Sequence, residues 1–158
     1  FMRKNIDLKE KIDLHNEGRL EIKKLYLTDI SFEAPNSPFE FAEDHKPSID
    51  IKLSSRNKRV DREQYEVSLR VTVTFGYDQK AGYVAEVEQS GLFCISGFNA
   101  EVLEAILSIE CLNILFPYVR EVVSDLAAKG GFPQLFLAPV NFAFLFKKAK
   151  HSEAASRL

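Results

Sequence analysis

The residue types that most often carry chemistry are few in this sequence and lie far apart. The three histidines, His15, His45 and His151, have no second histidine or cysteine at the spacing of a metal site. The two cysteines, Cys94 and Cys111, form no CxxC pair, and each is expected to be a buried, inert thiol in a reducing compartment. No nucleophile-elbow motif orders a serine with a histidine and an aspartate. The sequence therefore predicts no catalytic residue, no bound metal and no cofactor.

Phosphate binding and charge-driven binding also lack support. The glycine pair Gly130–Gly131 follows an expected helix, so Gly130 suits a helix C-cap with positive φ and not a phosphate loop. The 158-residue chain has a formal net charge of −2, which gives no electrostatic reason to expect nucleic acid or an anionic membrane as partner. The N-terminal segment lacks the apolar core of a signal peptide, and the longest apolar tract, 132–146, is too short and too interrupted to span a bilayer. We expect a cytoplasmic protein without direct membrane insertion.

What the sequence does contain is an excess of apolar side chains, with 13 phenylalanines in 158 residues. They gather in the last expected helix, about 141–150, and in the proline-rich connection 34–47. The side chains concerned are Phe142, Phe144, Leu145 and Phe146 in the helix, and Phe39 and Phe41 in the connection. One helix on a sheet hides one face only, so these side chains either line an open groove or close the core or an oligomer contact. An open groove would accept extended clients of many sequences, because apolar contacts are not directional.

The elements that must position these side chains are four strands followed by helices, an α+β fold. Alternating apolar and polar residues predict strands at 20–33, 49–54, 65–77 and 83–95. Local turns predict a four-stranded antiparallel meander with a long crossover loop after strand one. The basic stretch 56–62 is expected to be a solvated hairpin loop. In strand one the alternation places Ile22, Tyr26, Ile30 and Phe32 on one face and Asp29, Ser31 and Glu33 on the other, and in strand four Glu86 and Glu88 face away from the core.

A long or kinked helix and a C-terminal helix complete the expected fold. Asn99 is the expected N-cap, and Pro117 predicts a break or kink near 111–117. A stripe of Leu115, Tyr118, Val122 and Leu126 is expected to face the core. Residues 1–19 are read as a charged extension that could be disordered, 20–150 as a single domain, and 151–158 as a flexible tail.

One segment is recognisable. The string FPYVREVVSDLAAKGGFPQLFLAPVNF, residues 116–142, resembles the signature of the SecB family of bacterial export chaperones. Weaker resemblance extends through YLTDISFEAPNSP (26–38), YEVSLRVTVT (65–74) and EVEQSGLFCISG (86–97), so it covers about 20–147. The resemblance implies an ATP-independent holdase that forms a homotetramer, a dimer of dimers with helices packed at its centre. It also implies two partners, unfolded preproteins and the SecA motor.

The resemblance also assigns residues by position. Its client groove corresponds to Phe39, Phe41, Ile49, Ile51, Leu53, Phe142, Leu145 and Phe146. Its SecA contact corresponds to Asp29, Glu33 and Glu86, which the strand alternation independently places on polar faces. The basic segment 147–158 departs from the longer, often acidic tail of better-known members. Two alternatives stay open, namely a related chaperone dedicated to one partner such as a toxin–antitoxin system, and, more remotely, a small-ligand carrier or enzyme.

Overall fold

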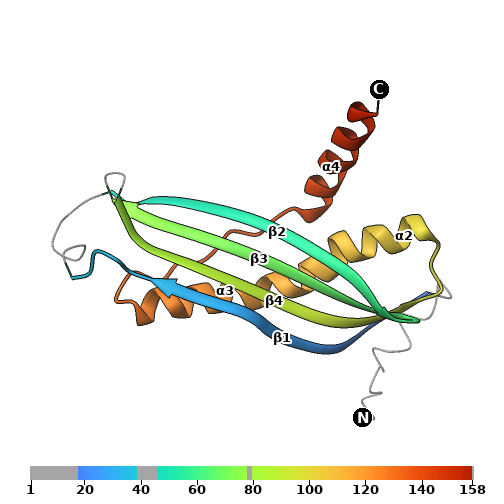
Figure 1. Ribbon diagram of the computed structural model, residues 1–158, viewed down its shortest axis with the longest axis horizontal. Helices are drawn as coiled ribbons and strands as arrows, with labels where there is room; N and C mark the ends of the chain where they lie inside the picture. Colours follow the sequence, from blue (N-terminus) through green and yellow to red (C-terminus); the bar gives the residue numbers. More distant parts are fainter. Residues whose placement is uncertain (1–17, 39–45, 78–79, 158) are drawn as a thin grey trace, which may run out of the picture.

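Four long antiparallel strands and a helical layer form the fold (Figure 1). A computed structural model describes residues 18–38, 46–77 and 80–157; the predictions for residues 1–17, Phe39 and Phe41 lie outside them. The strands are β1 (Arg19–Glu33), β2 (Ser48–Asp61), β3 (Gln64–Tyr77) and β4 (Lys80–Ser96). They are followed by α2 (Ala100–Ala105), a π-helical segment η2 (Ile106–Glu110), α3 (Cys111–Lys129) and α4 (Phe142–Ser156). The predicted α+β class is confirmed.

The strand order is β1-β4-β3-β2, with every neighbouring pair antiparallel. Strands β2, β3 and β4 follow one another directly, whereas β1 lies beside β4 at the far edge, so the chain crosses the sheet after β1 in a Greek-key arrangement. The predicted crossover is therefore confirmed. It leaves β1 and β2 as the two edge strands.

The expected hairpin loop at 56–62 is wrong, because β2 continues to Asp61. Its charged residues pair across the sheet with β3, with Arg56 opposite Ser68 and Lys58 opposite Glu66. Charged side chains are common on edge strands, where they discourage pairing with other chains. A run of basic residues therefore indicated an edge strand here and not a loop.

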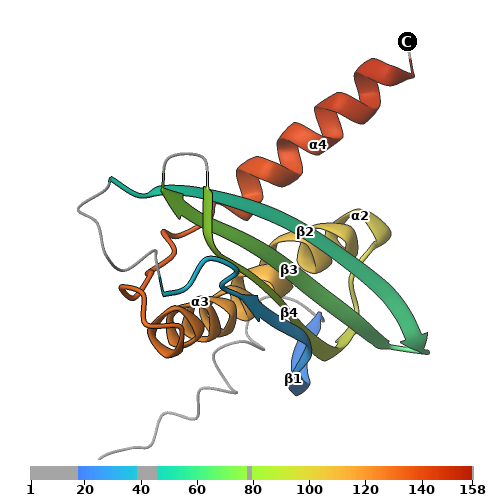
Figure 2. The same cartoon turned by 60° about the vertical axis from the view of Figure 1, so that its left-hand side comes forward.

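The core lies between one face of the sheet and the continuous helical layer of α2, η2 and α3 (Figure 2). The alternation predicted for the third strand is confirmed, since Val67, Leu69, Val71 and Val73 are all buried against this layer. Helix α3 packs on β3 and β4. The same face of the edge strand β2 stays half-exposed, with Ile49, Ile51 and Leu53 paired to buried residues of β3.

An aromatic cluster closes one end of this core. The Tyr83 ring stacks on Phe75 and Phe32, with centroids 5.0 Å and 5.2 Å apart, and its centroid lies 4.9 Å from that of Phe132. Tyr83 is fully buried, and within the described residues its hydroxyl has no hydrogen-bond partner. Burial raises the pKa of this hydroxyl above its usual range.

The alternation predicted for β1 is wrong in part of the strand. Register shifts fall between Ile22 and Lys24 and between Leu27 and Asp29. Each irregularity adds a residue and reverses the alternation that follows. Tyr26 consequently pairs with Ser90 and lies on the face turned away from the helices, so its predicted grouping with the apolar residues is wrong. Asp29 also lies on the face turned away from the helices, as predicted.

The helical layer begins as predicted but does not break. The side chain of Asn99 accepts a hydrogen bond from the Val102 amide at 2.9 Å and caps α2. Pro117 lies inside α3, so of the predicted break or kink near 111–117 the break does not occur. Both Pro117 and Asn113, whose carbonyl loses its helical donor, are exposed, so water can replace the missing amide. The irregularity lies earlier, in η2, where the amide of Cys111 bonds to Ile106.

The stripe predicted for α3 is rotated around the helix. Leu115 is buried as predicted, but Tyr118 is 47% exposed. The core-facing residues are instead Leu112, Leu115, Phe116, Val119, Val123 and Ala127. The apolar side of this helix is wider than the side that contacts the sheet, so spacing alone did not identify the buried residues.

The glycine pair ends α3 in a Schellman motif. The amide of Phe132 bonds to Ala127 at 3.0 Å and that of Gly131 to Ala128 at 3.1 Å. The positive φ, 83°, belongs to Gly131, whereas Gly130 keeps a helical conformation, so the predicted assignment was one residue early. Gly130 is needed for space, because a Cβ there would collide with the Phe32 ring.

Helix α4 projects away from the sheet and continues through Ser156, beyond its predicted end near residue 150 (Figure 1). By length and composition alone, Ala100–Lys129 could cross a membrane, with 39% of its apolar window buried within the subunit. Core helices of globular domains pass the same test, and the buried side of this helix packs on the sheet. More than half of the window has no cover within one subunit.

Candidate functional site

An apolar groove opens where the edge strand β2 meets η2, α3 and α4. It encloses about 300 Å³. Its apolar lining comprises Leu53 and Leu69 from the sheet, Leu112 from α3, and Phe142, Leu145, Phe146 and Ala149 from α4. The polar residues of the lining are Ser54, Ser55 and Ser108. Within the described residues the groove contains no histidine, cysteine or carboxylate, so it can bind apolar groups but offers no acid or base.

The groove has a fixed floor and an open rim. Phe142 is buried and contacts the Phe116 ring edge to face, with centroids 5.9 Å apart. Leu53 and Leu145, on opposite sides, remain 37% and 43% exposed. A bound segment would therefore rest on an ordered aromatic floor and cover side chains that water now contacts.

Polar contacts hold α4 beside the groove. The Asn141 side chain caps the helix by accepting from the Phe144 amide at 2.9 Å. Near the other end, Lys150 Nζ lies 2.5 Å from Glu104 Oε1 of α2. The connection before α4 is fixed by Arg120, whose Nε donates to the Leu137 carbonyl at 2.8 Å. These contacts at several points orient an element that otherwise projects from the domain.

Most predicted groove residues that the structure describes do come together. Leu53, Phe142, Leu145 and Phe146 line the groove, and Ile49 and Ile51 continue the same face along β2. Phe144, which composition also suggested, is 62% exposed and lies outside the lining. Leu69, Leu112 and Ser108 were not predicted as groove residues, since only the tertiary packing of α4 brings them to this site.

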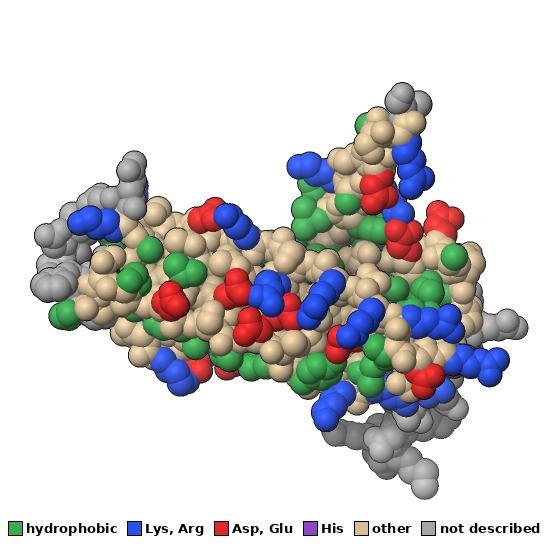
Figure 3. Space-filling view, in the orientation of Figure 1, with side chains coloured by type: hydrophobic (Ala, Val, Ile, Leu, Met, Phe, Trp, Pro, Cys, Tyr) green, Lys and Arg blue, Asp and Glu red, His purple; other side chains and the backbone are tan. Residues whose placement is uncertain are grey.

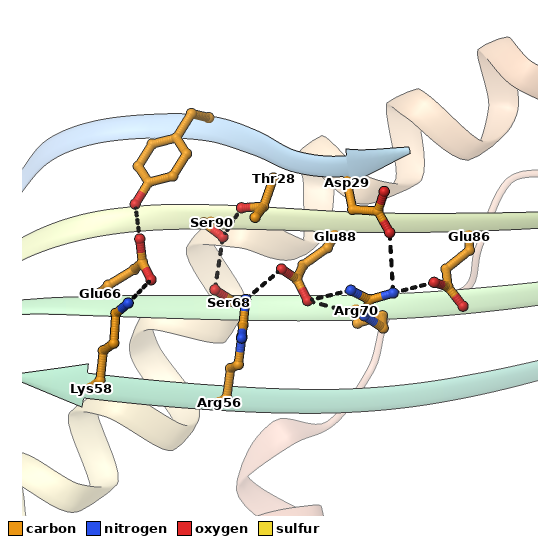
Figure 4. Close-up of polar contacts among 11 residues, drawn as sticks. Thr28, Asp29, Arg56, Lys58, Glu66, Ser68, Arg70, Glu86, Glu88 and Ser90 are labelled. Carbon is orange, nitrogen blue, oxygen red and sulfur yellow. Dashed lines mark hydrogen bonds and ion pairs between the residues drawn. The ribbon is translucent and has the colours of Figure 1, made fainter. Parts of the chain in front are cut away.

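The opposite face of the sheet, here called the outer surface, carries a network of charged side chains centred on Arg70 (Figure 4). Arg70 Nη1 lies 3.2 Å from Asp29 Oδ2 and also pairs with the Glu86 carboxylate. Its Nε and Nη2 each lie 3.0 Å from Glu88 Oε2, and Arg56 Nη2 donates to the other Glu88 oxygen at 2.8 Å. Glu86 also accepts from the Thr72 hydroxyl at 3.1 Å.

A second cluster of polar contacts lies on the same face, toward the other end of the sheet (Figure 4). Tyr26 donates to Glu66, whose other carboxylate oxygen lies 3.3 Å from Lys58 Nζ. Burial, followed by the bond to this carboxylate, raises the pKa of Tyr26 to about 12. The bond from Tyr26 in turn lowers the pKa of Glu66. Figure 3 shows acidic and basic side chains side by side along the middle of this face.

The three predicted acidic residues share the outer surface, but only two share a partner. Asp29 and Glu86 meet at Arg70, whereas Glu33, opposite Val84 in the register, lies farther along β1. Arg70 and Glu88 were predicted only to lie on a polar face. The alternation carried no signal that their side chains connect β1, β2 and β4.

Comparison with known proteins gives concordant matches over most of the chain. The family model described as "Preprotein translocase subunit SecB" matches residues 13–153. The protein-export protein SecB of Halorhodospira halophila is 42% identical over 138 residues, which cover 87% of this chain and 80% of that protein. That of Methylococcus capsulatus is 45% identical over 130 residues, covering 82% of this chain and 84% of that protein.

Among solved structures, a SecB-like chaperone of Mycobacterium tuberculosis in complex with a peptide from an antitoxin has a TM-score of 0.66. The identity is 20%, and the match covers 77% of this chain and 91% of that one. At this identity the likeness concerns the fold.

Proposed function

This chain belongs to the SecB family of protein-export chaperones, and we propose that it holds unfolded preproteins in the groove between β2 and α4 and delivers them to the SecA motor. The observation that carries the proposal is the open apolar groove, with its buried Phe142 floor and its half-exposed Leu53 and Leu145 rim. Burial of apolar surface releases about 25 cal/mol for each Å² and sets no demand on sequence order. A groove of this kind therefore suits many extended clients and requires no ATP.

The clients are unfolded because only an unfolded chain exposes a long apolar segment. Ile49, Ile51 and Leu53 form a continuous half-exposed row on the edge strand, which matches the alternate side chains of an extended client. Ser55, which shares the parity of Leu53, can hydrogen-bond to the backbone of the client. Phe39 and Phe41 complete the proposed set, with Ile49, Ile51, Leu53, Phe142, Leu145 and Phe146.

The holdase activity is tested by light scattering from a client that refolds from denaturant without ATP. A substoichiometric amount of the oligomer should suppress the scattering. An unchanged trace would contradict the proposal. Capture of one folded partner in place of many unfolded clients would instead indicate a chaperone dedicated to a single partner.

We propose a homotetramer, a dimer of dimers, assembled through the uncovered side of the long helix. Val102 and Tyr118 are 41% and 47% exposed there, beside the partly buried Ile114 and Val122. The apolar side of the helix extends beyond the part that the sheet covers, so a second copy is the natural cover in a protein that acts in the cytoplasm. Native mass spectrometry tests this assembly, and a monomer at micromolar concentration would contradict it.

The outer surface supports a separate docking site for SecA through Asp29, Glu33 and Glu86. Because neighbouring residues of a strand point to opposite faces, this surface and the groove are on different sides of one sheet. The triple change of these residues to lysine should weaken SecA binding and leave client binding intact. A control with Glu21, Asp61 and Glu63 changed to lysine alters the net charge equally, and equal loss in both variants would contradict a local site.

A further inference from the structure

Arg70 lies between two of the three carboxylates proposed to bind SecA. One of its nitrogens, Nη1, bridges Asp29 of β1 and Glu86 of β4 (Figure 4). The side chains of Asp29 and Glu86 nevertheless remain 47% and 33% exposed. Each carboxylate can therefore contact Arg70 and an external partner at the same time.

The other side of the same guanidinium is fixed by a buried anion. The Glu88 side chain is 4% exposed, and its Oε2 lies 3.0 Å from both Nε and Nη2 of Arg70. Its Oε1 accepts from Arg56 at 2.8 Å. Glu88 thus receives charge-assisted hydrogen bonds on both oxygens, which fix the plane and position of Arg70.

We propose that Arg70 is a positioning residue for SecA docking, anchored on Glu88 and holding Asp29 and Glu86 at a set spacing. The inference rests on the proposed function of the outer surface. Two neighbouring carboxylates repel each other, and a shared guanidinium lowers this repulsion before a cationic partner arrives. The partner then meets a surface whose side chains are already ordered, so less entropy is lost on binding.

A cation of the partner does not displace Arg70 in this scheme. If a cation of the partner displaced Arg70, the buried Glu88 would keep Arg56 as its remaining cation in the network. The Arg56 side chain is 66% exposed. Removing one partner of a buried ion pair is costly because the other charge stays buried. Arg70 therefore stays on Glu88 while Asp29 and Glu86 face the partner.

The test compares SecA binding kinetics of three variants, Arg70→Lys, Arg70→Gln and the double variant Arg70→Gln with Glu88→Gln. Lysine keeps the charge but has no fork that reaches three carboxylates, and the double variant keeps the net charge of the protein. We expect the Kd for SecA to rise about tenfold in all three, mainly through faster dissociation, since orientation is lost and long-range attraction is not.

Client binding and thermal melting of the same variants report on folding. The double variant removes the unpaired buried charge that Arg70→Gln creates, so it tests the inference even if the single variant is unstable. Wild-type affinity in Arg70→Lys would overturn the inference, because charge alone would then suffice. Tighter binding of Arg70→Gln or of the double variant would also overturn it, because Arg70 would then compete with the partner.

The two proposals fail in different ways. If the lysine triple variant at Asp29, Glu33 and Glu86 binds SecA normally, the docking surface itself is wrong. If that variant loses SecA while the Arg70 variants bind normally, the docking surface stands and the positioning role is wrong.

Discussion

Replacing Leu53 and Leu145 with serine should weaken client binding, at some cost in stability but without unfolding the protein. The two side chains lie on opposite sides of the groove and are 37% and 43% exposed. Full burial of a leucine side chain releases roughly 1.5–3 kcal/mol, so covering the exposed part of each releases about 1 kcal/mol. Losing both contributions, about 2 kcal/mol together, corresponds to a Kd roughly 30-fold higher.

The assay is fluorescence anisotropy with a labelled, permanently unfolded client. Phe144→Ser is the matched control, because Phe144 lies on the same helix, is 62% exposed and does not line the groove. The double variant should melt at a lower temperature than Phe144→Ser, since more than half of each leucine side chain is buried within the subunit, so binding is compared at a temperature at which both variants are folded. If the double variant binds as tightly as Phe144→Ser, the groove is not where clients bind.

Three further predictions concern the fold. Tyr83→Phe should raise the unfolding free energy by about 1 kcal/mol in denaturant titrations, because it removes a buried hydroxyl that has no partner within the described residues; a loss of stability would show that the hydroxyl is bonded. Gly131→Ala should cost about 1 kcal/mol because φ is 83°, with Gly131→Asn costing less, and equal stability of all three proteins would contradict this. Tyr26→Phe should lower the melting temperature at neutral pH. The bond from Tyr26 lowers the pKa of Glu66, so its contribution is present above the ordinary value of 4.5 and is lost as pH falls; an effect of unchanged size in acid would refute this.

The parts of the fold that could be predicted from sequence are those in which one local rule decides the outcome. In β3 every second residue is apolar, because one face packs on the helices and the other carries polar side chains, so the alternation assigned Val67 and Val71 correctly. In β1 the same rule misplaced Tyr26, because a bulge arises from pairing with β4 and leaves no mark in the local pattern. The basic stretch 56–62 was predicted as a loop because charged residues are typical of loops, but an edge strand also tolerates charge.

The groove depended on knowledge beyond local rules. Phe142 and Leu145 fall on one helical stripe, which spacing predicts, but the stripe does not tell which surface it meets. The packing of α4 beside Leu53 is a tertiary fact and was expected only through the family resemblance. On the outer surface the polar faces were predictable, whereas the convergence on Arg70 was not, because its three carboxylate partners come from two other strands, β1 and β4.

The pairing register of β3 limits how this protein can change over evolution. Leu69 and Arg70 are neighbours in the chain, yet the first lines the groove and the second organises the outer surface. Inserting or deleting one residue before them would send the guanidinium into the apolar core and the leucine into water. Both binding surfaces would be lost in one event. The sequence of β3 should therefore change by substitution during evolution, while the number of residues in the strand stays constant among functional descendants.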